Sequence, residues 1–128
     1  MSKISYSTMG FSDRDVDAAL DAIAVAGFDQ AEILGQAPHL AEPPSGPALT
    51  EFRTRLESRG LAGGTVHAPL TRNVLGAPEE DWRREKVGVL TAYLRFAAAI
   101  DATDIIIHPV PNPRFVPAAD HPDTPQLI

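Results

Sequence analysis

The 128-residue sequence has no cysteine, so disulfide bonds and thiolate chemistry are both excluded, and any metal would need His, Asp or Glu ligands. It also lacks an apolar run long enough for a membrane span, and we expect no membrane partner. Residues 1–10 contain one lysine and no hydrophobic core segment, which is atypical of a signal peptide. These absences predict a cytoplasmic protein.

Basic residues are outnumbered by acidic ones, and the formal net charge is −6. Nucleic-acid binding usually requires a basic surface, so no nucleic-acid partner is expected. The apolar fraction of 44% with 22% charged residues is typical of a globular chain, and the length fits one domain.

Apolar runs and amphipathic patterns alternate along the chain. Four short β-rich runs are separated by three stretches with helical spacing, of which the last, about residues 79–100, is the longest. Ser12, with Asp15 three residues later, is expected to cap the first of these helices. Because no hairpin signal joins the runs, the pattern predicts an α/β fold of four parallel strands and three helices.

Two histidines stand at the ends of such runs, in TVHAPL (residues 65–70) and in IIIHPV (residues 105–110). Ligands of parallel α/β folds bind at the carboxyl ends of the strands, so His67 and His108 are candidate site residues. Glu32 is the corresponding polar residue of the second run. Two imidazoles and a carboxylate at one rim could bind a divalent cation, position a sugar hydroxyl or move a proton. A structural role for each histidine is the alternative, and His39, in a proline-rich loop, is expected to be solvated.

Three segments carry a family resemblance: DAIAVAGFDQAEILG, LESRGLAGGTVHAPL and AAAIDATDIIIHPV. In their order and spacing they resemble the xylose isomerase-like TIM-barrel superfamily, which holds sugar and sugar-phosphate isomerases and epimerases together with endonuclease IV-type AP endonucleases. The resemblance covers about residues 4–111. It implies the first four units of an eight-unit barrel, so we expect residues 1–111 to form an N-terminal half-barrel and residues 112–128 to form a proline-rich extended or disordered tail.

The resemblance also implies roles for individual residues. His67 and His108 match histidines that line the substrate pocket in the sugar isomerase branch and hold zinc in the endonuclease branch. Glu32 matches the acid of the strand-two motif, and Asn73 falls where members carry Asn or Asp after the third strand. Accordingly, His67, His108, Glu32 and Asn73 are expected to bind a sugar or sugar phosphate.

The divalent metal of the isomerase branch (Mn, Mg, Co or Zn) is implied to bind strands five to eight of the intact enzyme, so this chain alone is expected to hold no metal tightly. The resemblance therefore implies the N-terminal part of a sugar isomerase or epimerase, incomplete as a catalyst alone. Two alternatives stay open: a fragment of a zinc hydrolase, in which His67 and His108 hold the metal, and a non-catalytic binding or assembly module. Since a four-stranded sheet has two open edges, we expect a missing C-terminal half or, second, a homodimer.

Overall fold

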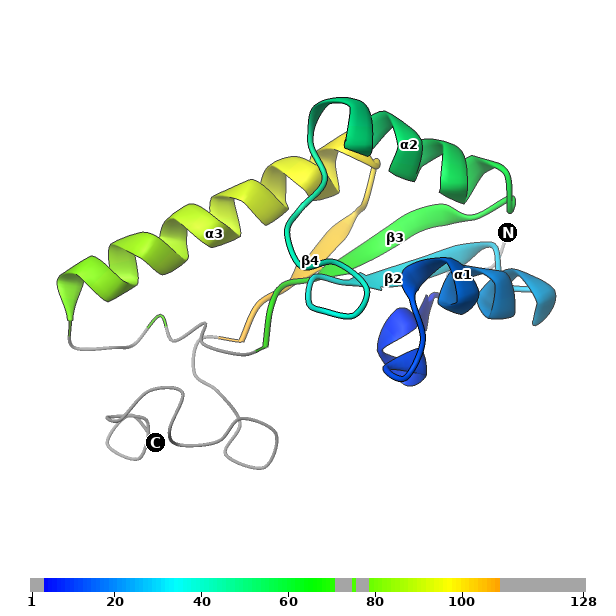
Figure 1. Ribbon diagram of the computed structural model, residues 1–128, viewed down its shortest axis with the longest axis horizontal. Coiled ribbons are helices and arrows are strands. Elements are labelled where there is room, and N and C mark those ends of the chain that lie inside the picture. The colour runs from blue at the N-terminus through cyan, green and yellow to red at the C-terminus, as the bar shows by residue number, and fades with distance from the viewer. Residues whose placement is uncertain (1–3, 71–74, 76–78, 109–128) are drawn as a thin grey trace.

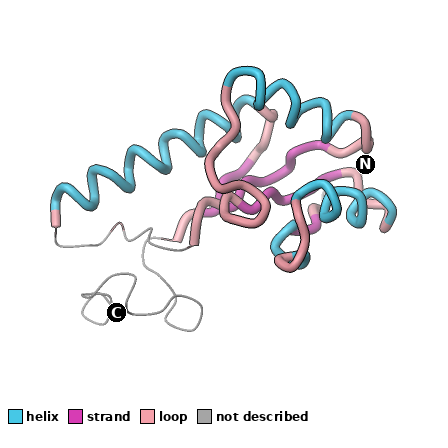
Figure 2. Tube along the Cα trace, in the orientation of Figure 1, coloured by secondary structure: helices cyan, strands magenta, loops and turns pink. Residues whose placement is uncertain are grey.

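A computed structural model describes residues 4–70, 75 and 79–108 of the chain. The elements follow one another as strand, helix, strand (Figures 1 and 2). In chain order they are β1 (Tyr6–Ser7), the 3-10 helix η1 (Thr8–Phe11), α1 (Val16–Val25), β2 (Gln30–Leu34), α2 (Gly46–Glu57), β3 (Ala62–His67), α3 (Glu80–Ala99) and β4 (Asp104–Ile106).

The four strands form one parallel sheet in the order β1-β2-β3-β4. Each strand therefore lies beside the strand that precedes it in the chain, as the sequence predicts. The register places Glu32 opposite Thr65, and His67 opposite Ile106. An irregularity between Ala31 and Glu32 shifts the pairing of β2 with β3 by one residue.

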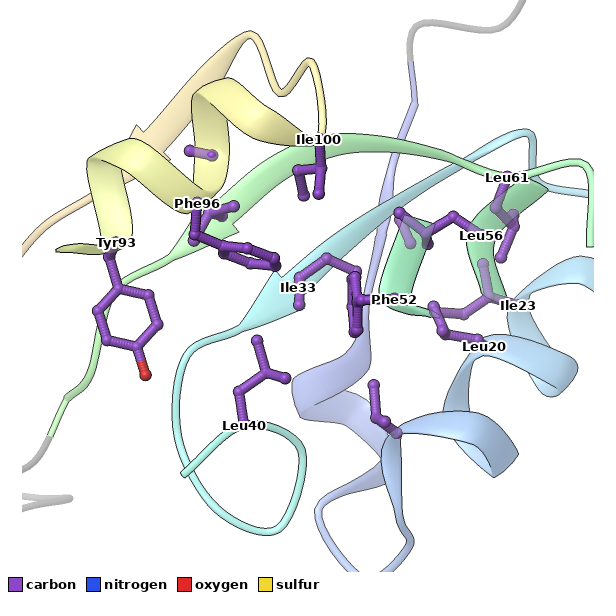
Figure 3. Packing of buried hydrophobic residues seen from close by; sticks show 14 residues of the cluster. Leu20, Ile23, Ile33, Leu40, Phe52, Leu56, Leu61, Tyr93, Phe96 and Ile100 are labelled. Carbon is purple, nitrogen blue, oxygen red and sulfur yellow. The ribbon is translucent and has the colours of Figure 1, made fainter. Parts of the chain in front are cut away.

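One face of the sheet is packed against helices. Figure 3 shows the side chains that fill the space between the sheet and the helices. Phe52 of α2 packs edge to face against Phe96 of α3, with 5.4 Å between the ring centroids. Burial of each large apolar side chain contributes about 1.5–3 kcal/mol to stability. The cluster comprises Val16, Leu20, Ile23, Ala31, Ile33, Leu40, Phe52, Leu56, Leu61, Val66, Tyr93, Phe96, Ala97 and Ile100.

The three described α-helices end in the same way. A residue with positive φ follows each helix, namely Gly27 (88°), Gly60 (67°) or Asp101 (58°). The next amide then donates back across the last turn, for example Phe28 N–H to the carbonyl of Ile23 at 3.3 Å. This 6→1 bond satisfies a carbonyl that the helix leaves open, and the left-handed residue reverses the chain toward the next strand.

The start of α1 differs from the prediction. Asp15, and not Ser12, is the N-cap, and its carboxylate accepts the amide of Ala18 at 2.8 Å. Ser12 instead ends η1, which occupies the segment after β1. A carboxylate at this position also interacts favourably with the positive end of the helix dipole, which favours Asp15 as the cap.

Residues 109–128 lie outside the described residues, so the expected domain boundary and proline-rich tail are untested. No helix in the part of the chain that the structure describes is long and apolar enough to cross a membrane.

Candidate functional site

His67 is the last residue of β3 and is buried, with 5% of its surface exposed. Its Nδ1 lies 3.0 Å from the carbonyl oxygen of Ala68. A carbonyl oxygen only accepts hydrogen bonds, so Nδ1 carries the proton and donates it. The Nε2 atom of neutral His67 is then a hydrogen-bond acceptor. The backbone beside the ring thus sets both its orientation and its tautomer.

His108 follows β4 and meets His67 directly. The two Nε2 atoms are 3.3 Å apart, and the ring centroids are 5.1 Å apart with planes inclined by 30°. Since Nε2 of His67 accepts, Nε2 of His108 must supply the proton of this contact. The structure therefore brings the two histidines together as a hydrogen-bonded pair.

Glu32 lies on the same face of the sheet but one row deeper. It is opposite Thr65, two residues before His67, and its Oε1 accepts a hydrogen bond from the Ser7 hydroxyl at 2.6 Å. Asn73 lies outside the described residues. Thus the two imidazoles meet at the rim, and the carboxylate is held by β1.

Contacts among the loops at the carboxyl ends of the strands position this rim. His39 Nε2 donates to the carbonyl of Phe11 at 3.1 Å, which ties the loop after β2 to η1. Gln36 Oε1 accepts the amide of Leu70 at 3.0 Å, which ties the same loop to the segment after β3.

The sequence-based prediction for His39 was wrong, because the residue is buried with 5% exposure and is not solvated. The prolines around His39 indicate a loop but not the direction of its side chain. Gln36 has no motif that would single it out.

Gly35 brings α3 close to the end of β3. Its amide donates to the carbonyl of His67 at 2.7 Å. A Cβ atom at this position would lie 2.5 Å from Cε1 of Tyr93 and 2.9 Å from that same carbonyl oxygen. Tyr93 is 1% exposed, and burial, with a smaller contribution from the carboxylate of Glu42, raises its pKa to about 12.

The described residues do not form a metal centre on their own. Within residues 4–70, 75 and 79–108, no three His, Asp or Glu side chains gather in a way that could hold a metal ion. The His67–His108 pair offers two imidazole nitrogens, and a structural or catalytic zinc site uses at least three protein ligands.

Three consecutive parallel β/α units and a fourth strand, with polar side chains at the carboxyl ends of the strands, define the fold as part of a (β/α) barrel. The comparisons with known proteins specify it further. No family model matches the sequence, and no curated protein gives a significant match.

Three solved structures of 17–19% identity share the fold. The chain is similar to a 3-keto-D-glucoside 4-epimerase from E. coli (TM-score 0.65, 18% identity, 86% of this chain and 39% of that chain). It is also similar to a D-psicose 3-epimerase from Clostridium cellulolyticum solved with D-tagatose (TM-score 0.60, 19% identity, 80% of this chain and 36% of that chain). The third is a fusion of a xylose isomerase-like TIM barrel with 4-hydroxyphenylpyruvate dioxygenase (TM-score 0.56, 17% identity, 79% of this chain and 15% of that chain).

The chain therefore shares the fold of part of a TIM barrel with these proteins and spans well under half the length of each. The fold class expected from the sequence is confirmed.

Proposed function

We propose that the chain is the N-terminal part of a divalent-metal-dependent sugar isomerase or epimerase, to which it contributes one side of the substrate pocket. The observation that carries this proposal is the His67–His108 pair at the carboxyl ends of neighbouring barrel strands, where ligands of such folds bind. Two of the similar folds belong to sugar epimerases, which supports a sugar as the substrate class.

In this proposal the chain's own residues bind and orient the substrate. The Nδ1 atom of His108 accepts a hydrogen bond in the tautomer that the pair requires, so it is suited to a sugar hydroxyl. When bound in the intact enzyme, the metal would polarise hydroxyl and carbonyl oxygens for proton transfer next to a carbonyl. Because the described residues hold no set of three ligands, that metal is proposed to bind elsewhere in the intact enzyme, and the chain alone is proposed to be an incomplete catalyst.

Sugar binding tests the proposal. Saturation-transfer NMR with D-psicose and D-tagatose should detect binding by the wild-type chain, reduced at least tenfold in the His67→Ala and His108→Ala variants. Val25→Ala is a matched control, because Val25 is 89% exposed on α1 and should leave binding unchanged. Absence of sugar binding, or binding that both histidine variants retain, would refute the proposal.

A zinc site is a second candidate function, favoured by one distance. Two nitrogen ligands of a tetrahedral zinc ion lie about 3.3 Å apart when each bond is about 2.0–2.1 Å. The Nε2 atoms of His67 and His108 have this separation, and the Nδ1–H of His67 donates to a carbonyl, as metal-bound histidines commonly do.

Titration with Zn²⁺ or Co²⁺ separates the two candidates. Micromolar affinity that is lost in His67→Ala would support the zinc hydrolase alternative. If the wild-type chain and His67→Ala bind the metal with equal affinity, the two histidines would instead be residues of the sugar pocket.

The open edges of the sheet indicate which partners the chain could bind. Within the described residues, β1 and β4 each pair with one strand only. Unpaired edges favour association with further strands, and we propose that a C-terminal half or, second, another copy of the chain covers them. A stable, well-folded monomer in a solution mass measurement of this chain would count against both. The cytoplasmic location expected from the sequence stays a prediction.

A further inference from the structure

The helix-free face of the sheet is polar below the histidines. Because side chains alternate along a strand, Ser7, Glu32, Thr65 and Asp104 form one row across the four strands. The inward rows of a (β/α) barrel are usually filled by bulky branched residues such as Val, Ile and Leu. Two hydroxyls and two carboxylates in this row predict hydrogen bonding to a ligand instead of a dry core.

The hydrogen bonds of Ser7 fix the orientation of the Glu32 carboxylate. The Ser7 hydroxyl oxygen accepts the amide of Met9 at 3.2 Å, as the N-cap of η1. Its proton is thereby left to donate to Oε1 of Glu32 at 2.6 Å. The carboxylate is held by this strong, charge-assisted bond, and no Lys or Arg within the described residues forms an ion pair with it. It is therefore oriented to accept a further hydrogen bond.

The distribution of basic residues matters for the charge of the ligand. No Lys or Arg lies on any of the described strands. The described basic residues are all on helices or in the loops beside them: Arg14, Arg53, Arg55, Arg59, Arg83, Arg84, Lys86 and Arg95. Phosphate groups are usually bound by arginine, lysine or the amides of a helix N-terminus. Within the described residues, the strand face offers a phosphate carboxylates, hydroxyls, the amide of Gln30 and the two histidines, and no Lys or Arg.

Two of the three described α-helices, α1 and α3, carry acidic side chains at their starts, whereas α2 carries none in its first turn. Asp15 already caps α1, and Asp17 lies in its first turn. The first turn of α3 carries Glu80 and Asp81. These acids occupy or oppose the positive ends of two helix dipoles and so weaken anion binding at the starts of α1 and α3. Asp17 is also paired with Arg55 and Arg59, and Glu80 with Arg84.

We propose that the row formed by Ser7, Glu32 and Thr65 binds hydroxyls of an uncharged sugar and selects against its phosphate ester. This inference rests on the proposed function and narrows its substrate class. Glu32 accepts a sugar hydroxyl, Thr65 offers a second hydroxyl contact, and Ser7 is a positioning residue for the carboxylate. A phosphorylated sugar is rejected because Glu32 and Asp104 repel its charge and no Lys or Arg on the described strands compensates it.

Comparison of a ketohexose with its own phosphate tests this selection. The probes are D-psicose and D-psicose 6-phosphate, titrated into the full chain by NMR. The wild-type chain should bind the neutral sugar at least tenfold more tightly. Glu32→Gln should weaken binding of the neutral sugar severalfold and tighten binding of the phosphate, so that the two affinities differ by less than threefold.

Two further variants and a control accompany Glu32→Gln. Thr65→Val should weaken binding of the neutral sugar about fivefold, as expected for loss of one hydrogen bond. Ser7→Ala should also weaken it, because Glu32 loses the hydrogen bond that orients its carboxylate. Both variants also keep the test decisive if Glu32→Gln does not fold. Glu51→Gln changes the net charge by the same amount on the exposed surface of α2 and should leave both affinities unchanged.

The outcomes separate this inference from the proposed function. Equal or tighter binding of the phosphate, or an affinity ratio that Glu32→Gln does not change, would overturn the inference and leave the proposed function standing. Failure of the chain to bind either compound would refute the proposed function and this inference with it.

Discussion

The Nε2 atoms of His67 and His108 lie 3.3 Å apart, although these histidines are 41 positions apart in the chain. The parallel register produces this contact. His67 ends β3 opposite Ile106, and His108 is two residues further along on the same side of the sheet. One proton occupies the contact, and the carbonyl of Ala68 determines which ring supplies it.

The first prediction concerns the tautomers of the pair. At a pH where both rings are neutral, His67 should be protonated at Nδ1 and His108 at Nε2. Long-range ¹H–¹⁵N correlation spectra distinguish the two forms by their nitrogen shifts. His108→Ala should leave His67 protonated at Nδ1, because the carbonyl of Ala68 is unaffected. Protonation of His67 at Nε2 in the wild-type chain would contradict the hydrogen-bond assignment.

The order and type of the elements could be predicted from the sequence because each signal is local. In α1, Val16, Ala19, Leu20 and Ile23 recur at helical spacing, and all four are buried. Gly27 and Gly60 stop their helices by adopting positive φ. His67 and His108 lie at the same edge of the sheet because neighbouring units pair in parallel, and the alternating pattern indicates this pairing.

Contacts that depend on loop paths could not be predicted in this way. The bond from His39 to the carbonyl of Phe11 joins the loop after β2 to η1, and the path of this loop has no periodicity in the sequence. The hydrogen bond of Glu32 with Ser7 depends on the register of β1 against β2, which hydrophobic pattern alone does not set for so short a strand.

The second prediction concerns the approach of α3 to the sheet. Gly35→Ala places a methyl group against Tyr93 and the carbonyl of His67, so it should lower the free energy of unfolding by about 1–3 kcal/mol. Gly88→Ala is the matched control, since Gly88 is exposed on α3 and a Cβ there would contact nothing within 4 Å. It should raise stability by about 0.5–1 kcal/mol through helix propensity.

Urea unfolding followed by circular dichroism measures both changes. A Gly35→Ala variant as stable as the wild-type chain would show that Tyr93 can move away without cost, against the packing described for this end of β2.

The third prediction concerns the residue that ends α3. Asp101 has a φ of 58°, a conformation that costs a residue with a side chain about 1–2 kcal/mol, less for Asp than for most residues. Its carboxylate also lies at the negative end of the helix dipole. Asp101→Gly should therefore stabilise the fold by about 1 kcal/mol, and Asp101→Asn should give a smaller gain.

Gly60→Ala provides the reverse test at the equivalent position after α2. Gly60 has a φ of 67°, and a Cβ atom at this position would have nothing within 4 Å, so only the backbone conformation opposes the substitution. Destabilisation by about 1 kcal/mol is expected in thermal or urea unfolding. If Asp101→Gly lowered stability instead, the side chain of Asp101 would have to make a stabilising contact that outweighs both costs.

The fourth prediction is a loss of stability at high pH that depends on Tyr93. The hydroxyl of Tyr93 has no hydrogen-bond partner among the described residues, and burial raises its pKa from 10.0 to about 12. Between these values the unfolded chain has lost this proton and the folded chain keeps it. Stability due to this group is therefore complete below pH 10 and falls as the pH rises toward 12, by about 1 kcal/mol at pH 11.

Tyr93→Phe should remove this part of the pH dependence, because phenylalanine has no proton to lose. Since no hydrogen bond within the described residues is lost, the variant should be as stable as the wild-type chain at pH 8 or slightly more stable. Tyr6→Phe is the control at an exposed ring, 44% accessible, and should keep the wild-type slope. Urea midpoints at pH 8, 10 and 11 for the three proteins measure the difference. Equal slopes for Tyr93→Phe and the wild-type chain would mean that Tyr93 ionises in the folded protein as readily as in the unfolded chain.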